Sequence, residues 1–140
     1  MIRYLDASAQ AKTYVEEEGS DLVRRWVRSG AVWVSRLGLV EVHSALVRLS
    51  RAGHITRSQF RVALAAMEAD SRRIPIAELD PAVGDMAIRL LRDHPLRGAD
   101  AVHLASALGL KERLGTVTFA SWDARLNRAA SAEGLSVEGG

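Results

Sequence analysis

Four acidic residues in this chain of 140 residues have the type and placement for metal chemistry. Asp6 follows the strand-like run IRYL, Asp123 comes soon after the run VTFA, Glu41 lies in the mostly apolar stretch LGLVEVHSAL, and Asp100 follows the loop HPLRGA. The chain has no cysteine, which excludes a thiolate metal site, a disulfide and a cysteine nucleophile. Carboxylates without cysteine or a closely spaced histidine pair favour a hard cation such as Mg²⁺ or Mn²⁺.

Three of these acids also have a simpler structural explanation. Aspartate suits the start of a helix, where it accepts hydrogen bonds from free backbone N–H groups and favours the positive end of the helix dipole. Asp6, Asp100 and Asp123 all fit that role. Glu41 does not, because an unpaired carboxylate among apolar residues costs free energy or shifts its pKa. A divalent cation would compensate its charge.

The elements that must position these acids alternate between strand-like and helix-like patterns. The alternation predicts a single α/β domain over residues 1–140, with a five-stranded parallel sheet and helices on both faces. Ser20 is a candidate N-cap, and Gly19 and Gly30 are candidate helix ends. We expect strands at residues 2–5, 31–35, 74–79, 116–121 and 135–139, and helices at residues 9–18, 20–30, 37–52, 56–72, 80–94, 99–115 and 122–134.

The order of the strands decides whether the acids meet. In open α/β sheets, ligands bind beyond the carboxyl ends of the strands, where the strand order reverses. If the order is 3-2-1-4-5, the first and fourth strands are neighbours and the carboxylates of Asp6 and Asp123 converge. Glu41 and Asp100 can reach the same edge. The sequence therefore predicts an acidic pocket at the carboxyl edge of the sheet.

Composition and charge narrow the class of protein. Apolar residues make up 48% and charged residues 26%, which is ordinary for a folded globular domain. No apolar run approaches the roughly 20 residues that cross a bilayer, so we expect a cytoplasmic protein. The formal charge is +2, but ten arginines and three acids between residues 24 and 73 give that segment a net charge of +7. A basic surface around an acidic pocket suits a polyanion.

Three arginines are candidates for contacts with the phosphates of such a polyanion. Arg48 lies two helical turns beyond Glu41, and Arg97 and Arg125 flank Asp100 and Asp123. Guanidinium groups match phosphates with two parallel hydrogen bonds. Each of the three is also explained as a solvated surface residue.

Four blocks, YLDASAQAK, LGLVEVHSALVRL, HPLRGADAVHLASAL and TFASWDARL, carry a family resemblance. In this order and spacing they resemble the motifs of PIN-domain ribonucleases, most closely the VapC-type toxins of type II toxin-antitoxin pairs. The resemblance spans nearly the whole chain. It implies that Asp6, Glu41, Asp100 and Asp123 form a catalytic acidic tetrad that binds one or two Mg²⁺ ions, with Mn²⁺ as the other candidate. Ser8 and Ser121 would orient carboxylates, waters or a substrate phosphate.

The resemblance also implies an activity and partners. A metal-activated water would cleave tRNA or rRNA and so inhibit translation. Family members form homodimers and are silenced by a small antitoxin whose tail lies over the active-site groove. Residues 39–64 supply two amphipathic helices for that groove, unless their apolar stripes only pack the core.

Other functions stay open at this point. The chain could be a housekeeping PIN nuclease in RNA maturation, or a catalytically idle PIN module that binds RNA or protein. A phosphatase of the DxD type has no support, because Ser8 stands where the second aspartate would be.

Two further residues have more than one interpretation. Trp122 stands where the family usually has a small residue, and it is either a hydrophobic anchor or a platform for a stacked base. His103 lies one helical turn beyond Asp100. It is either a structural residue held by hydrogen bonds or a group that polarises a carboxylate.

Overall fold

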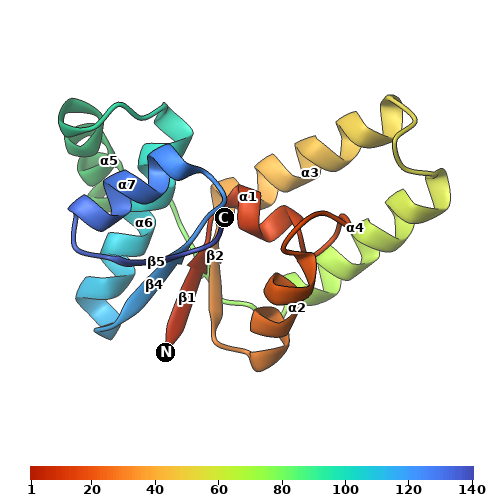
Figure 1. The fold of residues 1–140 in the computed structure, drawn as a ribbon, viewed down its shortest axis with the longest axis horizontal. Coiled ribbons are helices and arrows are strands. Elements are labelled where there is room, and N and C mark those ends of the chain that lie inside the picture. Colours follow the sequence, from red (N-terminus) through yellow and green to blue (C-terminus); the bar gives the residue numbers. More distant parts are fainter.

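The computed structural model describes residues 1–140 and contains one five-stranded parallel sheet (Figure 1). Its order is β3-β2-β1-β4-β5, and every adjacent pair is parallel. The expected α/β class and the 3-2-1-4-5 order are therefore confirmed. The strands are β1 (Ile2–Leu5), β2 (Val32–Ser35), β3 (Ile76–Ala77), β4 (Val117–Ala120) and β5 (Ser136–Glu138).

Seven helices surround this sheet. Figure 1 shows α5, α6 and α7 gathered on one side and α1 to α4 on the other, with α3 and α4 extending away from the sheet as a pair. None of the helices combines the length and apolar composition needed to cross a bilayer. The helices are α1 (Ala7–Ala11), α2 (Ser20–Ser29), α3 (Arg36–Arg51), α4 (Arg57–Ser71), α5 (Pro81–Asp93), α6 (Gly98–Leu114) and α7 (Ala124–Ala132).

Two apolar clusters fill the two faces of the sheet. Neighbouring residues of a strand point to opposite faces. Tyr4 and Phe119 accordingly pack into one cluster with α5, α6 and α7, whereas Leu5 and Ala120 pack into the other with α1 and α2. A third, smaller cluster joins α3 to α4.

Strand register sets the geometry of the site. In the β1–β4 pair, Leu5 lies opposite Ala120, and the Asp6 backbone N–H donates to the Ala120 carbonyl at 3.2 Å. Both strands end at this level, so Asp6 and Ser121 leave the sheet side by side. The carboxyl ends of the two central strands thus meet at the point where the strand order reverses.

The first expected helix is wrong in its extent. The sequence predicts it at residues 9–18, but α1 begins at Ala7 and ends at Ala11, and residues 12–18 form a turn followed by irregular structure. Three successive glutamates, at positions 16 to 18, would face the negative end of the dipole of a longer helix. The Ser20 hydroxyl instead accepts from Glu17 N–H and donates to the Val15 carbonyl.

Two other expectations need correction. Ser20 is not an N-cap, because Gly19 occupies that position with a φ of 90° and Ser20 is the first residue of α2. The third strand is also shorter than the predicted residues 74–79, since only Ile76 and Ala77 pair with β2. Pro75 has no N–H to donate to a ladder, which limits the strand on that side.

The turn at Gly19 supports a stability prediction. A Cβ atom built at Gly19 would lie 2.5 Å from Trp122 Cζ2, at a positive φ that L residues rarely adopt. Gly19→Ala should therefore lower the free energy of unfolding by roughly 2–4 kcal/mol, from backbone strain plus overpacking. The measurement is urea unfolding followed by circular dichroism.

Gly30→Ala is the matched control. Gly30 has a φ of 80°, but a Cβ atom there would have no neighbour within 4 Å. This variant should lose only the strain contribution, about 1 kcal/mol. Equal losses in the two variants would show that Gly19 and Trp122 are not in close contact.

Candidate active site

Asp6 is a buried carboxylate held by three hydrogen bonds. It is the N-cap of α1, and its Oδ1 atom accepts from the Ala9 backbone N–H at 2.9 Å and from the Ser8 hydroxyl at 2.6 Å. Its Oδ2 atom accepts from the Ser121 hydroxyl at 2.6 Å. Asp6 therefore combines the capping role with a fixed, charged position between β1 and β4.

The two serine hydroxyls connect Asp6 to the turn after β4. Ser8 Oγ accepts from the Trp122 backbone N–H at 3.0 Å, and Ser121 Oγ accepts from the Asp123 backbone N–H at 2.9 Å. The two hydroxyl oxygens are 3.4 Å apart. Each serine thus donates to the carboxylate of Asp6 and accepts from the backbone beside Asp123, which fixes the two acidic residues relative to each other.

Asp100 and Asp123 line one polar cavity of about 370 Å³. Asp123 is the N-cap of α7, where its Oδ1 atom accepts from the backbone N–H groups of Arg125 and Leu126. Asp100 lies in the first turn of α6. Burial raises the pKa of Asp100 above its ordinary value, and the negative charges of Asp123 and Asp6 raise it further. Three of the four acids therefore share one electrostatic environment.

Glu41 belongs to a chain of hydrogen bonds that passes through His103. Glu41 Oε1 lies 2.5 Å from His103 Nε2, and His103 Nδ1 lies 2.7 Å from the Tyr4 hydroxyl oxygen. The Glu41 carboxylate can only accept, so His103 Nε2 donates to it. In the neutral imidazole, Nδ1 then accepts from the Tyr4 hydroxyl. His103 thus orients a candidate catalytic carboxylate.

Comparison with known proteins identifies the family. A family model described as PIN domain matches residues 3–132. This chain belongs to the PIN-domain family. Its resemblance to VapC-type members is also confirmed, because the PIN domain is 41% identical over 135 residues to Ribonuclease VapC49 of Mycobacterium tuberculosis strain H37Rv. That alignment covers 96% of this chain and 92% of the relative.

Other relatives agree with this assignment. Ribonuclease VapC46 of the same strain is 36% identical over 135 residues, which cover 96% of this chain and 94% of the relative. Among solved structures, VapBC2 from Rickettsia felis bound to a DNA fragment from their promoter has a TM-score of 0.69 at 12% identity, covering 100% of this chain and 99% of that one. PAE2754 from Pyrobaculum aerophilum has a TM-score of 0.69 at 17% identity, covering 98% and 83%. Both structures share the fold of this PIN domain.

The carboxylates of the PIN domain fit a hard divalent cation by their chemistry. All the donors are oxygens, and the pKa of Asp100 is raised by burial and by the negative charge of Asp123, both of which a cation would offset. However, no three acidic or histidine side chains lie close enough together to ligate a single ion as the structure stands. Asp6 is linked through Ser121 to the backbone of Asp123, and Asp123 lines one cavity with Asp100, whereas Glu41 is held by His103. The four-residue tetrad therefore stays a prediction.

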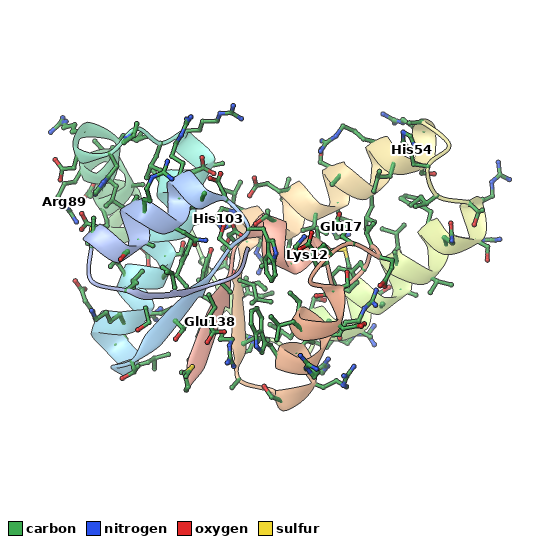
Figure 2. All side chains as sticks on the ribbon, in the orientation of Figure 1. Lys12, Glu17, His54, Arg89, His103 and Glu138 are labelled. Atoms are coloured by element: carbon green, nitrogen blue, oxygen red, sulfur yellow. The ribbon has the colours of Figure 1, made fainter.

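Trp122 packs as a hydrophobic anchor of the PIN domain. Its ring lies 6.1 Å from the ring of Trp26 and contacts the apolar cluster of β2 and α2. The Nζ atom of Lys12 lies 4.8 Å from the Trp122 ring and 3.0 Å from Glu17 Oε2. Figure 2 shows Lys12 and Glu17 together near the centre of the molecule. The sequence analysis did not identify Lys12, although it is one of only two lysines in the chain.

The arginine candidates separate into two groups. Arg97 and Arg125 line the cavity that contains Asp100 and Asp123. Arg48 is exposed in the last turn of α3, donates to the Ser44 hydroxyl at 2.8 Å and does not line this cavity. Arg128 does line it, and the sequence analysis missed this residue. Its spacing of three residues from Arg125 on a helix is the signal that could have found it.

The remaining histidines lie outside the site. His43 Nδ1 lies 2.7 Å from the Leu39 carbonyl oxygen, and His94 Nε2 lies 2.7 Å from Glu133 Oε2. His54 is at the far tip of the α3–α4 pair, as Figure 2 shows.

Proposed function

We propose that this PIN domain is a divalent-metal-dependent endoribonuclease that acts as the toxin of a toxin-antitoxin pair. Its relatives named Ribonuclease VapC support the ribonuclease activity and the toxin class. The observation that supports the metal dependence is the placement of acidic residues at the edge where the strand order reverses: Ser121 links Asp6 to the backbone of Asp123, and Asp123 lines one cavity with Asp100.

The residues of the site have two kinds of task in this proposal: the acids bind the metal ion, and their neighbours hold them in place. Asp6, Asp100 and Asp123, together with Glu41, would hold Mg²⁺ or Mn²⁺. A bound ion of this kind lowers the pKa of water to give a nucleophile and stabilises charge on a phosphoryl oxygen. Ser8 and Ser121 hold the Asp6 carboxylate in place, and His103 holds Glu41. No side chain of the protein needs to form a covalent intermediate.

The proposed partners are an RNA substrate, an antitoxin and a second copy of the chain. tRNA or rRNA is the proposed target, and its cleavage would inhibit translation in the cytoplasm. The shared fold with VapBC2 supports a small antitoxin as partner. In residues 39–64, Val42 and Leu46 are buried within the α3–α4 cluster, so an antitoxin would meet exposed residues such as Val40 and Val62 instead.

The test is incubation of the purified protein with total bacterial RNA in Mg²⁺, in Mn²⁺ and in EDTA. We expect discrete RNA fragments with either metal and intact RNA in EDTA, resolved on a denaturing gel and located by end mapping. Intact RNA in all three conditions, with the RNA still bound to the protein, would overturn the nuclease and favour an idle binding module.

Expression in a bacterial host tests the toxin role separately. Growth should stop on induction and recover when a cognate antitoxin is coexpressed. Normal growth with abundant, active protein would favour a housekeeping nuclease in RNA maturation instead.

A further inference from the structure

The cavity beside Asp100 and Asp123 contains charges of both signs. Six residues line its volume of about 370 Å³, and Ala124 is the one without a polar side chain. Two residues are the acids, and the other three are arginines: Arg97, Arg125 and Arg128. Such a lining excludes an apolar ligand and favours one that is itself ionic.

The three arginines are free although two carboxylates line the same cavity. None of their guanidinium groups forms an ion pair or a hydrogen bond within the chain. Six arginines elsewhere form ion pairs with carboxylates, for example Arg36 with Glu78 at 2.6 Å and Arg3 with Glu138 at 2.9 Å, whereas the three that share this cavity with two carboxylates do not. The site therefore leaves carboxylates available to a cation and guanidinium groups available to an anion.

The arginines come from two elements that meet at the cavity. Arg125 and Arg128 are three residues apart on α7, so they share one face of that helix. Arg97 is the N-cap residue of α6, and its side chain makes no capping hydrogen bond. All three are exposed at the surface. Three guanidinium groups around one opening suit a phosphate, because each can donate two parallel hydrogen bonds to its oxygens.

We propose that Arg97, Arg125 and Arg128 form a phosphate subsite that binds the RNA backbone next to the acidic residues. This inference deepens the proposed ribonuclease function and rests on it for RNA as the polyanion. The subsite binds the phosphate next to the one that is cleaved. The arginines neutralise the charge of that phosphate, which reduces the repulsion between the RNA and the acidic residues. Of the three arginines expected from the sequence, Arg97 and Arg125 belong to this subsite and Arg48 does not, and Arg128 is the third member.

The first experiment measures RNA binding without cleavage. A fluorescently labelled oligouridylate is titrated with the full-length protein in EDTA, and anisotropy is recorded over a range of KCl concentrations. Each of Arg97→Gln, Arg125→Gln and Arg128→Gln should weaken binding about fivefold at 0.1 M salt and reduce the slope of log K against log salt by about 0.7. The triple variant should lose about 100-fold.

Arg92→Gln is the matched control. Arg92 is also exposed and without an ion pair, but it belongs to α5 and does not line the cavity. It should bind the oligouridylate as the unsubstituted protein does. If Arg61→Gln on the basic α3–α4 pair loses as much affinity as the triple variant, or if the triple variant binds normally, the subsite is wrong.

Kinetics in Mg²⁺ add a second readout. With total tRNA as substrate, the triple variant should show a raised KM and a kcat within about twofold, because a flanking phosphate contributes equally to ground and transition states. A fall in kcat with unchanged KM would overturn the subsite. If the unsubstituted protein cleaves no RNA at all, the ribonuclease proposal fails, whereas the binding result in EDTA still decides whether the arginines bind RNA.

Discussion

Asp100→Asn should reduce RNA cleavage by at least about 1000-fold without destabilising the protein. The loss of activity follows from removing a charge that would bind the metal ion. The stability follows from the environment of Asp100, whose pKa is raised by burial and by Asp123. A carboxylate in such a place opposes folding when it is ionised, so the neutral amide should give an equal or higher melting temperature. Gel-based cleavage rates and thermal unfolding in EDTA measure the two effects.

The dependence on pH provides an internal check. A raised pKa in the folded state means that the contribution of Asp100 to stability is present at pH values below its unfolded pKa. It is lost as the pH rises through the folded pKa. The Asp100→Asn variant should therefore gain stability over the unsubstituted protein as the pH rises from acidic to neutral. Added Mg²⁺ should stabilise the unsubstituted protein and have little effect on the variant.

Asp80→Asn is the control for a helix-start aspartate outside the site. Asp80 caps α5 and accepts from the Val83 backbone N–H at 2.9 Å. Asparagine also caps helices well, so cleavage should be unchanged in this variant. A cleavage rate in Asp100→Asn close to that of Asp80→Asn would remove Asp100 from the metal site and leave it as a residue of the helix start.

Much of the site was predictable because Asp6, Asp100 and Asp123 each stand next to the end of a strand or the start of a helix. Asp6 is the clearest example, since its position after a four-residue strand fixes both its capping role and its place at the sheet edge. The expected strand order predicted that the turn after β4 lies beside Asp6, because β1 and β4 are neighbours, and Ser121 in that turn donates to Asp6.

The contacts that the sequence could not predict join side chains far apart in the chain. His103 was noticed for its spacing from Asp100, but its partners Glu41 and Tyr4 are 62 and 99 residues away. Likewise, Lys12 lies over the Trp122 ring because the helix ends at Ala11 and the chain turns there. Helical periodicity predicts which residues of one helix share a face. It does not predict which side chains of other elements contact that face.

Replacement of His103 should separate the positioning of Glu41 from the stability of the core. His103→Leu fills the same buried space with an apolar side chain. It removes the donor to Glu41 and leaves the buried Tyr4 hydroxyl without the Nδ1 acceptor. We expect cleavage to fall about 10- to 100-fold, as for other residues that orient a metal ligand. The free energy of unfolding should fall by about 1–3 kcal/mol because of the unpaired hydroxyl. Cleavage rates and urea unfolding are the measurements.

Two matched variants decide whether His103 acts through Glu41. His103→Gln can still donate a side-chain N–H to Glu41, so it should recover most of the cleavage rate while remaining as destabilised as His103→Leu. Tyr4→Phe leaves His103 in place and removes the hydroxyl that bonds to Nδ1, so its cleavage rate should fall less than that of His103→Leu. If His103→Gln and His103→Leu lose activity equally and in proportion to their loss of stability, His103 is a structural residue of the core and the orientation of Glu41 depends on other contacts.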